Sequence, residues 1–82
     1  MMQCMNNDFS NEFKKLGRVI GTLRKQAGLY QEELAFRASI DRTYISQIER
    51  GVGNPSLLIV LKIAKAINVN ISTLFLQFNT SV

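Results

Sequence analysis

The spacing of apolar residues near the start of the chain restricts it to a helical fold. Six of them follow one another at intervals of 4, 3, 4, 3 and 4 residues: Phe9, Phe13, Leu16, Ile20, Leu23 and Ala27. This spacing places them on one face of an α-helix, predicted from about Phe9 to Gln26. No segment alternates apolar and polar residues for long enough to predict a β-strand. The sequence therefore predicts an all-α fold.

Four further helices are predicted from residues that begin or end helices. The expected ranges are 31–38, 42–50, 57–67 and 71–78. Gly28 ends the first helix and Gly51 ends the third, because glycine readily adopts the left-handed conformation of a helix end. Asp41 and Ser56 carry side chains suited to capping the starts of the third and fourth helices. The predicted architecture is thus a single domain of five helices over residues 1–82.

Composition gives only a broad indication of the partner. The chain carries ten Lys and Arg against six Asp and Glu, a net charge of +4. This excess is compatible with a polyanion, and it is also common in unrelated small proteins.

Several function classes find no support in the sequence. There is no histidine, the carboxylates form no acid–base pair, and neither a phosphate-binding glycine loop nor metal-ligand spacing occurs. Cys4 is the only cysteine, which favours the cytoplasm. Neither a signal peptide nor a membrane span is recognised. We therefore expect a binding module rather than an enzyme, with no cofactor, metal, membrane or small-molecule ligand.

Residues 31–50 form the pattern of a helix-turn-helix. Two helices of about eight residues are joined by Ser39, Ile40 and Asp41. Small or apolar side chains occupy the positions where the two helices must cross and share a core. These positions are Leu34, Ala35, Ala38, Ile40, Ile45 and Ile48.

The motifs themselves resemble a known family. "QEELAFRASIDRTYISQIERG", followed by "NPSL" and "LKIAKAINV", is similar to the repressor-like helix-turn-helix family of Cro and cI type. Within it, "DRTYISQIERG" with "GNPSL" most resembles the controller proteins of restriction–modification systems. The resemblance runs from Phe13 to Phe75. It implies a lambda-repressor-like DNA-binding domain that acts as a homodimer on a double-stranded operator. The regulated genes would be its own and that of the endonuclease, with RNA polymerase as a further partner.

The outer face of the 42–50 helix is predicted to read bases. In this fold the second helix of the motif lies in the major groove. An arginine can donate two hydrogen bonds to guanine, a glutamine can pair with adenine, and a threonine methyl suits thymine. The predicted base-reading residues are Arg42, Thr43, Ser46 and Gln47. Taken alone, such a row is also what an ordinary solvated helix face looks like.

Other polar residues are expected to hold the DNA backbone. Gln31 and Ser56 lie at helix N-termini, which attract phosphates, and Asn54 lies in the loop between. These positions match the backbone contacts of the family. Tyr44 is open between a DNA contact and a cover for the edge of the 31–38 helix.

Two residues are assigned a structural role by resemblance. Arg24 and Glu49 correspond to a partly buried ion pair of the family. The chain departs from the family pattern at Tyr30, where a capping Thr or Ser is usual. It departs again at Ser39, where a left-handed glycine is usual.

The last two helices, residues 57–78, are predicted to form a dimer interface. They are richer in apolar residues than a helix with one solvated face requires. The expected interface residues are Leu58, Ile59, Leu74, Phe75 and Phe78. Ordinary scatter of exposed apolar side chains is the alternative.

Two other functions remain open at this point. A phage-type or antitoxin-type repressor would share the same chemistry and differ in its gene context. A protein-interaction adaptor would keep the fold and lack DNA reading.

Overall fold

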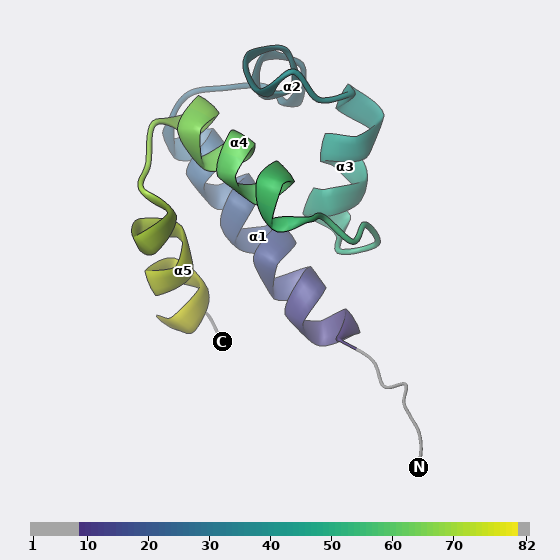
Figure 1. Cartoon of the computed structure of the whole chain (residues 1–82), viewed down its shortest axis with the longest axis vertical. Coiled ribbons are helices and arrows are strands. Elements are labelled where there is room, and N and C mark those ends of the chain that lie inside the picture. Colours follow the sequence, from purple (N-terminus) through teal and green to yellow (C-terminus); the bar gives the residue numbers. More distant parts are fainter. Residues whose placement is uncertain (1–8, 81–82) are drawn as a thin grey trace.

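The computed structural model describes residues 9–80, all of them helical or in short connections (Figure 1). Its five helices are α1 (Ser10–Gln26), α2 (Gln31–Ala38), α3 (Arg42–Arg50), α4 (Leu57–Ile67) and α5 (Ile71–Thr80). The described residues contain no β-strand. The all-α, five-helix prediction is confirmed, and α5 extends two residues beyond its expected end. Cys4 lies outside the described residues.

All five helices contribute to one core. In Figure 1, α4 crosses in front of α1, α2 and α3 lie at one end, and α5 lies on the opposite side from α3. The side chains that are almost completely enclosed come from every helix: Ile20, Leu34, Ile45, Ile48, Ile63 and Leu74. The short helices therefore depend on packing against one another, since helices of this length are marginal in isolation.

The two ends of the predicted apolar stripe on α1 lie outside the core. Phe9 is 67% exposed and precedes the helix, and Ala27 is exposed at its C-cap. The remaining helices are much shorter than α1, whose 17 residues span about 25 Å. The helical period was right, but it could not show where the core ends.

Two glycines let α3 approach α1 closely. A Cβ on Gly17 would collide with the carbonyl oxygens of Ile48 and Glu49. A Cβ on Gly21 would lie 3.2 Å from Oε1 of Glu49. The C-terminal end of the predicted recognition helix therefore rests on α1 at two positions, Gly17 and Gly21, that have no side chain.

The helices begin and end close to where predicted, but not every predicted capping hydrogen bond is present. Ser56 caps α4, its hydroxyl oxygen accepting the Ile59 N–H at 3.3 Å. Asp41 occupies the N-cap of α3, but its side chain makes no capping hydrogen bond, which corrects that expectation. Ser39 is left-handed, with φ 57°, as the family pattern implies. A non-glycine residue in that conformation costs about 1–2 kcal/mol.

The start of α2 is capped from inside the helix. Tyr30 is the N-cap residue and its side chain is 76% exposed. Its backbone N–H donates to Oε1 of Glu33 at 2.8 Å, so the Glu33 half of a capping box is present. A capping group on the side chain of residue 30 is what this helix still lacks.

Candidate nucleic-acid interface

The predicted recognition helix α3 separates its side chains into two faces. Ile45 and Ile48 are buried against α1 and α2. Arg42 and Thr43 are exposed, and Ser46 and Gln47 are half-buried. Within residues 9–80, none of these four polar side chains has a hydrogen-bond partner. The structure thus brings the four predicted base-reading residues together on one outward face whose polar groups are free.

Tyr44 lies between these two faces. Its side chain is half-buried and packs against the core. This packing is compatible with the covering role that was one of its two predicted alternatives, and that role stays a prediction. A contact between its phenol and DNA stays a prediction.

The predicted backbone-holding residues occupy three different settings. Asn54 is exposed in the loop between α3 and α4. Ser56 uses its oxygen for the cap of α4, which leaves its hydroxyl proton available as a donor. Gln31 is half-buried at the start of α2, and its side-chain amide is already engaged within the protein.

Arg24 and Glu49 form the ion pair that the family resemblance implied. Nε of Arg24 donates to Oε2 of Glu49 at 2.7 Å, and Nη2 donates to Oε1 at 3.0 Å. Their side chains are 9% and 10% exposed. Nη1 of Arg24 also donates to the carbonyl oxygen of Leu29 at 2.8 Å. The pair thus links α1, the segment before α2 and the end of α3.

Sequence reasoning missed a third side chain in this cluster. Nε2 of Gln31 donates to Oε1 of Glu49 at 3.1 Å. The two residues are 18 positions apart, and nothing in the spacing or the family pattern indicated the contact. It connects a residue predicted to hold DNA with one predicted to be structural.

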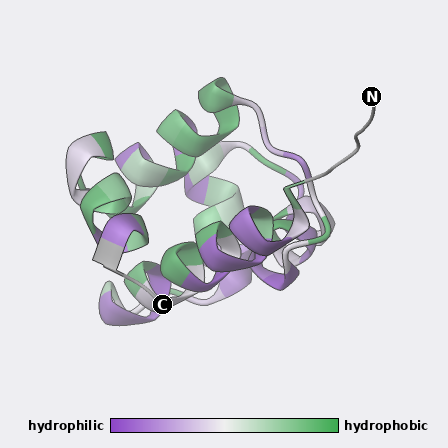
Figure 2. Cartoon of the chain, turned by 90° about the horizontal axis from the view of Figure 1, so that it is seen from below, coloured by the Kyte–Doolittle hydropathy of each residue, from purple (hydrophilic) through white to green (hydrophobic). Residues whose placement is uncertain are grey.

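The first turns of α4 and the middle of α5 expose apolar side chains. On α4, Leu57, Leu58 and Leu61 are 63%, 61% and 42% exposed, and on α5 Phe75 is 44% exposed. In Figure 2 the start of α4 is a run of green, the hydrophobic end of the scale. This surface, defined by Leu57, Leu58, Leu61 and Phe75, is called the apolar surface below.

Three of the predicted dimer residues face inward to different degrees. Leu74 is fully buried, so its assignment to an exposed interface was wrong. The reason is the helical period, because position 74 on α5 faces the core while position 75 faces away. Ile59 and Phe78 are half-buried against the core, and the Nζ of Lys15 lies 5.1 Å from the centre of the Phe78 ring.

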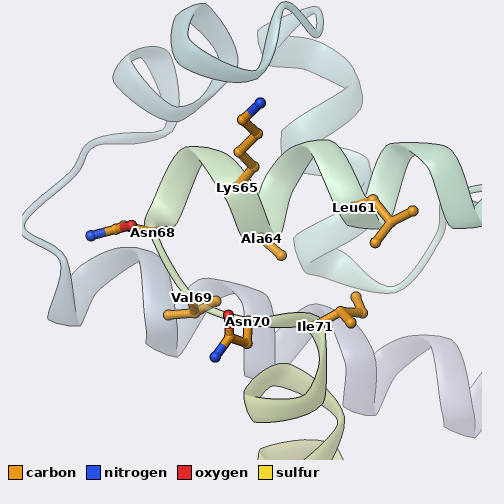
Figure 3. Close-up of a pocket in the computed structure, with 7 residues that line it drawn as sticks. All are labelled: Leu61, Ala64, Lys65, Asn68, Val69, Asn70 and Ile71. Atoms are coloured by element: carbon orange, nitrogen blue, oxygen red, sulfur yellow. The ribbon is translucent and has the colours of Figure 1, made fainter.

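A hollow of about 430 Å³ lies between α4 and the start of α5, beside Leu61 (Figure 3). Figure 3 shows its polar side chains pointing in different directions, Lys65 away from Leu61 and Asn68 off the end of α4. A small-molecule site requires a few polar groups that converge on the ligand. The hollow has no such arrangement.

The described part of the chain contains neither a single helix suited to crossing a membrane nor a cluster of metal-binding side chains. Between residues 9 and 80, no helix alone has the length and apolar character of a membrane span. Only α4 and α5 together reach them, and they are bent by 103°. Within the same residues, no group of three or more His, Cys, Asp or Glu could hold a metal ion.

The chain is similar in sequence and structure to characterised proteins. Residues 20–74 match the family described as Helix-turn-helix. Control protein C.BamHI of Bacillus amyloliquefaciens is 47% identical over 55 residues, 67% of each chain.

Two solved structures extend this likeness. The controller protein C.AhdI from Aeromonas hydrophila is 39% identical, with a TM-score of 0.76 over 82% of this chain and all of that one. The C.Esp1396I tetramer bound to its natural 35 base-pair operator is 34% identical, with a TM-score of 0.79 over 83% of this chain and 90% of that one. The chain therefore belongs to the helix-turn-helix family, and its fold is that of the restriction–modification controller proteins.

Proposed function

We propose that this protein is a cytoplasmic, homodimeric transcriptional regulator that controls the genes of a restriction–modification system, its own among them. One observation carries the proposal. The outward face of α3 presents four polar side chains without partners in the described chain, while Ile45 and Ile48 fix the helix to the core. In a family whose members include an operator-bound controller protein, such a face is best explained as a base-reading surface.

Each residue of this face has a chemistry suited to base edges. The guanidinium of Arg42 can donate two parallel hydrogen bonds to O6 and N7 of guanine. The amide of Gln47 suits adenine, and the hydroxyl and methyl groups of Thr43 suit thymine. Ser46 is half-buried and adds a hydroxyl that can donate or accept.

The backbone contacts would surround this face. Gln31 and Ser56 lie at the N-termini of α2 and α4, where unpaired backbone N–H groups favour phosphate. Asn54 is exposed between α3 and α4. These contacts fix the docking position and carry no sequence information themselves.

Pairing of two copies through the apolar surface would complete the DNA-binding unit. Two recognition helices about 34–36 Å apart match one turn of DNA and so read a symmetric operator. Where such a dimer activates transcription, RNA polymerase is the further partner.

Binding of wild type and Arg42→Ala to three kinds of DNA tests the proposal. The probes are the region upstream of the protein's own gene, single-base variants of it and random duplex, at fixed salt. Arg42→Ala should lose about 1–3 kcal/mol per half-site on the operator and much less on random DNA. The preference at one base pair should also relax. Some uniform weakening is expected as well, because the variant loses a charge.

Other results would reassign the face. An equal loss on all three DNAs would make Arg42 a backbone contact. No change on any of them would favour the protein-interaction adaptor. The genes beside the coding sequence separate a controller from a phage-type or antitoxin-type repressor.

A further inference from the structure

Gln31 is the point where the proposed DNA backbone contacts meet the buried ion pair. Its Nε2 lies 3.1 Å from Oε1 of Glu49, and the same oxygen accepts Nη2 of Arg24 at 3.0 Å. Gln31 is half-buried, whereas the Glu49 side chain is only 10% exposed. The carboxylate of Glu49 thus lies behind Gln31, on the protein side.

A carboxylate neighbour determines which end of the Gln31 amide faces inward. An ionised carboxylate only accepts hydrogen bonds, so the amide must turn its NH₂ group, rather than its oxygen, toward Glu49. The NH₂ group has two protons, and Glu49 takes one. The second proton remains for an acceptor outside the protein. Phosphate oxygens are also acceptors only, so this orientation is the one that a DNA backbone requires.

Glu49 itself is held so that it cannot easily turn. Arg24 binds both of its oxygens through Nε and Nη2, and a third donor, Nη1, binds the carbonyl oxygen of Leu29, two residues before Gln31. Gly21 leaves just enough room for the carboxylate, since a Cβ there would lie 3.2 Å from Oε1. Arg24 therefore holds in place both the Glu49 carboxylate, which binds the Gln31 amide, and the backbone two residues before Gln31.

The charge around this position makes the orientation important. The first turn of α2 also carries Glu32 and Glu33, both exposed and both acidic. Glu33 folds back onto the N–H of Tyr30, but its charge still opposes an approaching phosphate. An oriented N–H donor at Gln31 therefore supplies an attraction for phosphate beside two side chains that repel it.

We propose that Glu49 is a positioning residue for DNA binding. Its carboxylate orients the Gln31 amide, with one N–H directed at the DNA backbone, before the DNA arrives. A contact that is already oriented binds more tightly because less ordering is required on association. The proposal rests on the proposed function, and it gives the Arg24–Glu49 pair a role in DNA affinity in addition to its role in the fold.

A double-mutant cycle tests the coupling between the two residues. Wild type, Gln31→Ala, Glu49→Gln and the double variant are titrated with a random-sequence duplex and with the upstream region of the protein's own gene. Each single variant should bind both DNAs roughly two- to tenfold more weakly, the effect of one hydrogen bond. The double variant should bind no more weakly than Gln31→Ala alone. A purely structural role of Glu49 would instead weaken binding by the same factor in both backgrounds.

The outcomes separate this inference from the proposed function. Multiplied losses in the double variant, or a Gln31→Ala protein that binds like wild type, overturn the positioning role and leave DNA binding intact. A wild-type protein that binds neither DNA overturns both proposals.

A second measurement on the wild-type protein covers the case in which Glu49→Gln does not fold. The side-chain amide resonances of Gln31 are identified by NMR from their loss in Gln31→Ala. In the free protein they should differ from those of an unstructured glutamine, and random duplex should shift them further. Gln26, exposed near the end of α1, is the matched control and should not shift. Free-glutamine resonances for Gln31, or no response to DNA, overturn the proposal.

Discussion

Replacing Gly17 by alanine should destabilise the protein, although the same change in an ordinary helix stabilises it. Alanine is favoured over glycine inside a helix by about 1 kcal/mol. Here the new Cβ would lie 2.6 Å from the carbonyl oxygen of Glu49, where ordinary contacts begin at 3.4 Å, and would also collide with that of Ile48. Both obstacles are backbone atoms of α3, so no side-chain rotation can relieve them.

The size of the effect follows from these two opposing contributions. Overpacking a close contact costs about 1–3 kcal/mol, and a backbone collision belongs at the upper end. After the gain in helix propensity, a net loss of about 2 kcal/mol remains. For a domain of this size, that lowers the melting temperature by roughly 8–16 °C. Thermal unfolding followed by circular dichroism measures it directly.

Gly21→Ala is the matched control, one helical turn further along α1. Its Cβ would meet Oε1 of Glu49 at 3.2 Å, so the carboxylate has to shift by only a few tenths of an ångström and need not turn away from Arg24. We expect its melting temperature to stay within about 4 °C of wild type. If Gly17→Ala melts at or above the wild-type temperature, the close approach of α1 and α3 does not exist in solution.

Two further predictions concern the apolar surface and the start of α2. Leu58→Glu should yield monomers in sedimentation and weaken operator binding. Phe36→Glu is the control, an equally polar change at a side chain that is 87% exposed on α2, and it should leave the dimer intact. A wild-type protein that sediments as a monomer with and without DNA contradicts the dimer. Tyr30→Thr should stabilise the fold by about 1 kcal/mol in urea unfolding by supplying the missing cap, and Tyr30→Ala should give no such gain. Clear destabilisation by Tyr30→Thr would show that the phenol packs usefully.

Helix positions were predictable because local chemistry determines them. Gly28 and Gly51 both adopt positive φ and lie just beyond the ends of α1 and α3. The bounds of α2 and α4 agree with the prediction for a similar reason, since the residues at their ends favour helix starts and stops. The left-handed Ser39 needed the family pattern, because serine itself does not favour that conformation.

Contacts between distant residues were less accessible. Leu74 and Phe75 are neighbours of equal apolar character, and only the packing of α5 shows that the first is buried and the second exposed. The bond between Gln31 and Glu49 depends on how α2 and α3 are placed together. Periodicity describes one helix at a time and therefore cannot supply such a contact.

The separation of buried and exposed positions on α3 has a consequence for how this protein can diversify. Ile45 is 0% and Ile48 is 2% exposed, while Arg42 and Thr43 face solvent. Substitutions at exposed positions usually change stability by less than about 0.5 kcal/mol, so the outer residues can be exchanged while the core pair stays the same. Under the proposed base-reading role of these residues, descendants of one ancestral chain can acquire new operators one residue at a time without passing through unfolded intermediates.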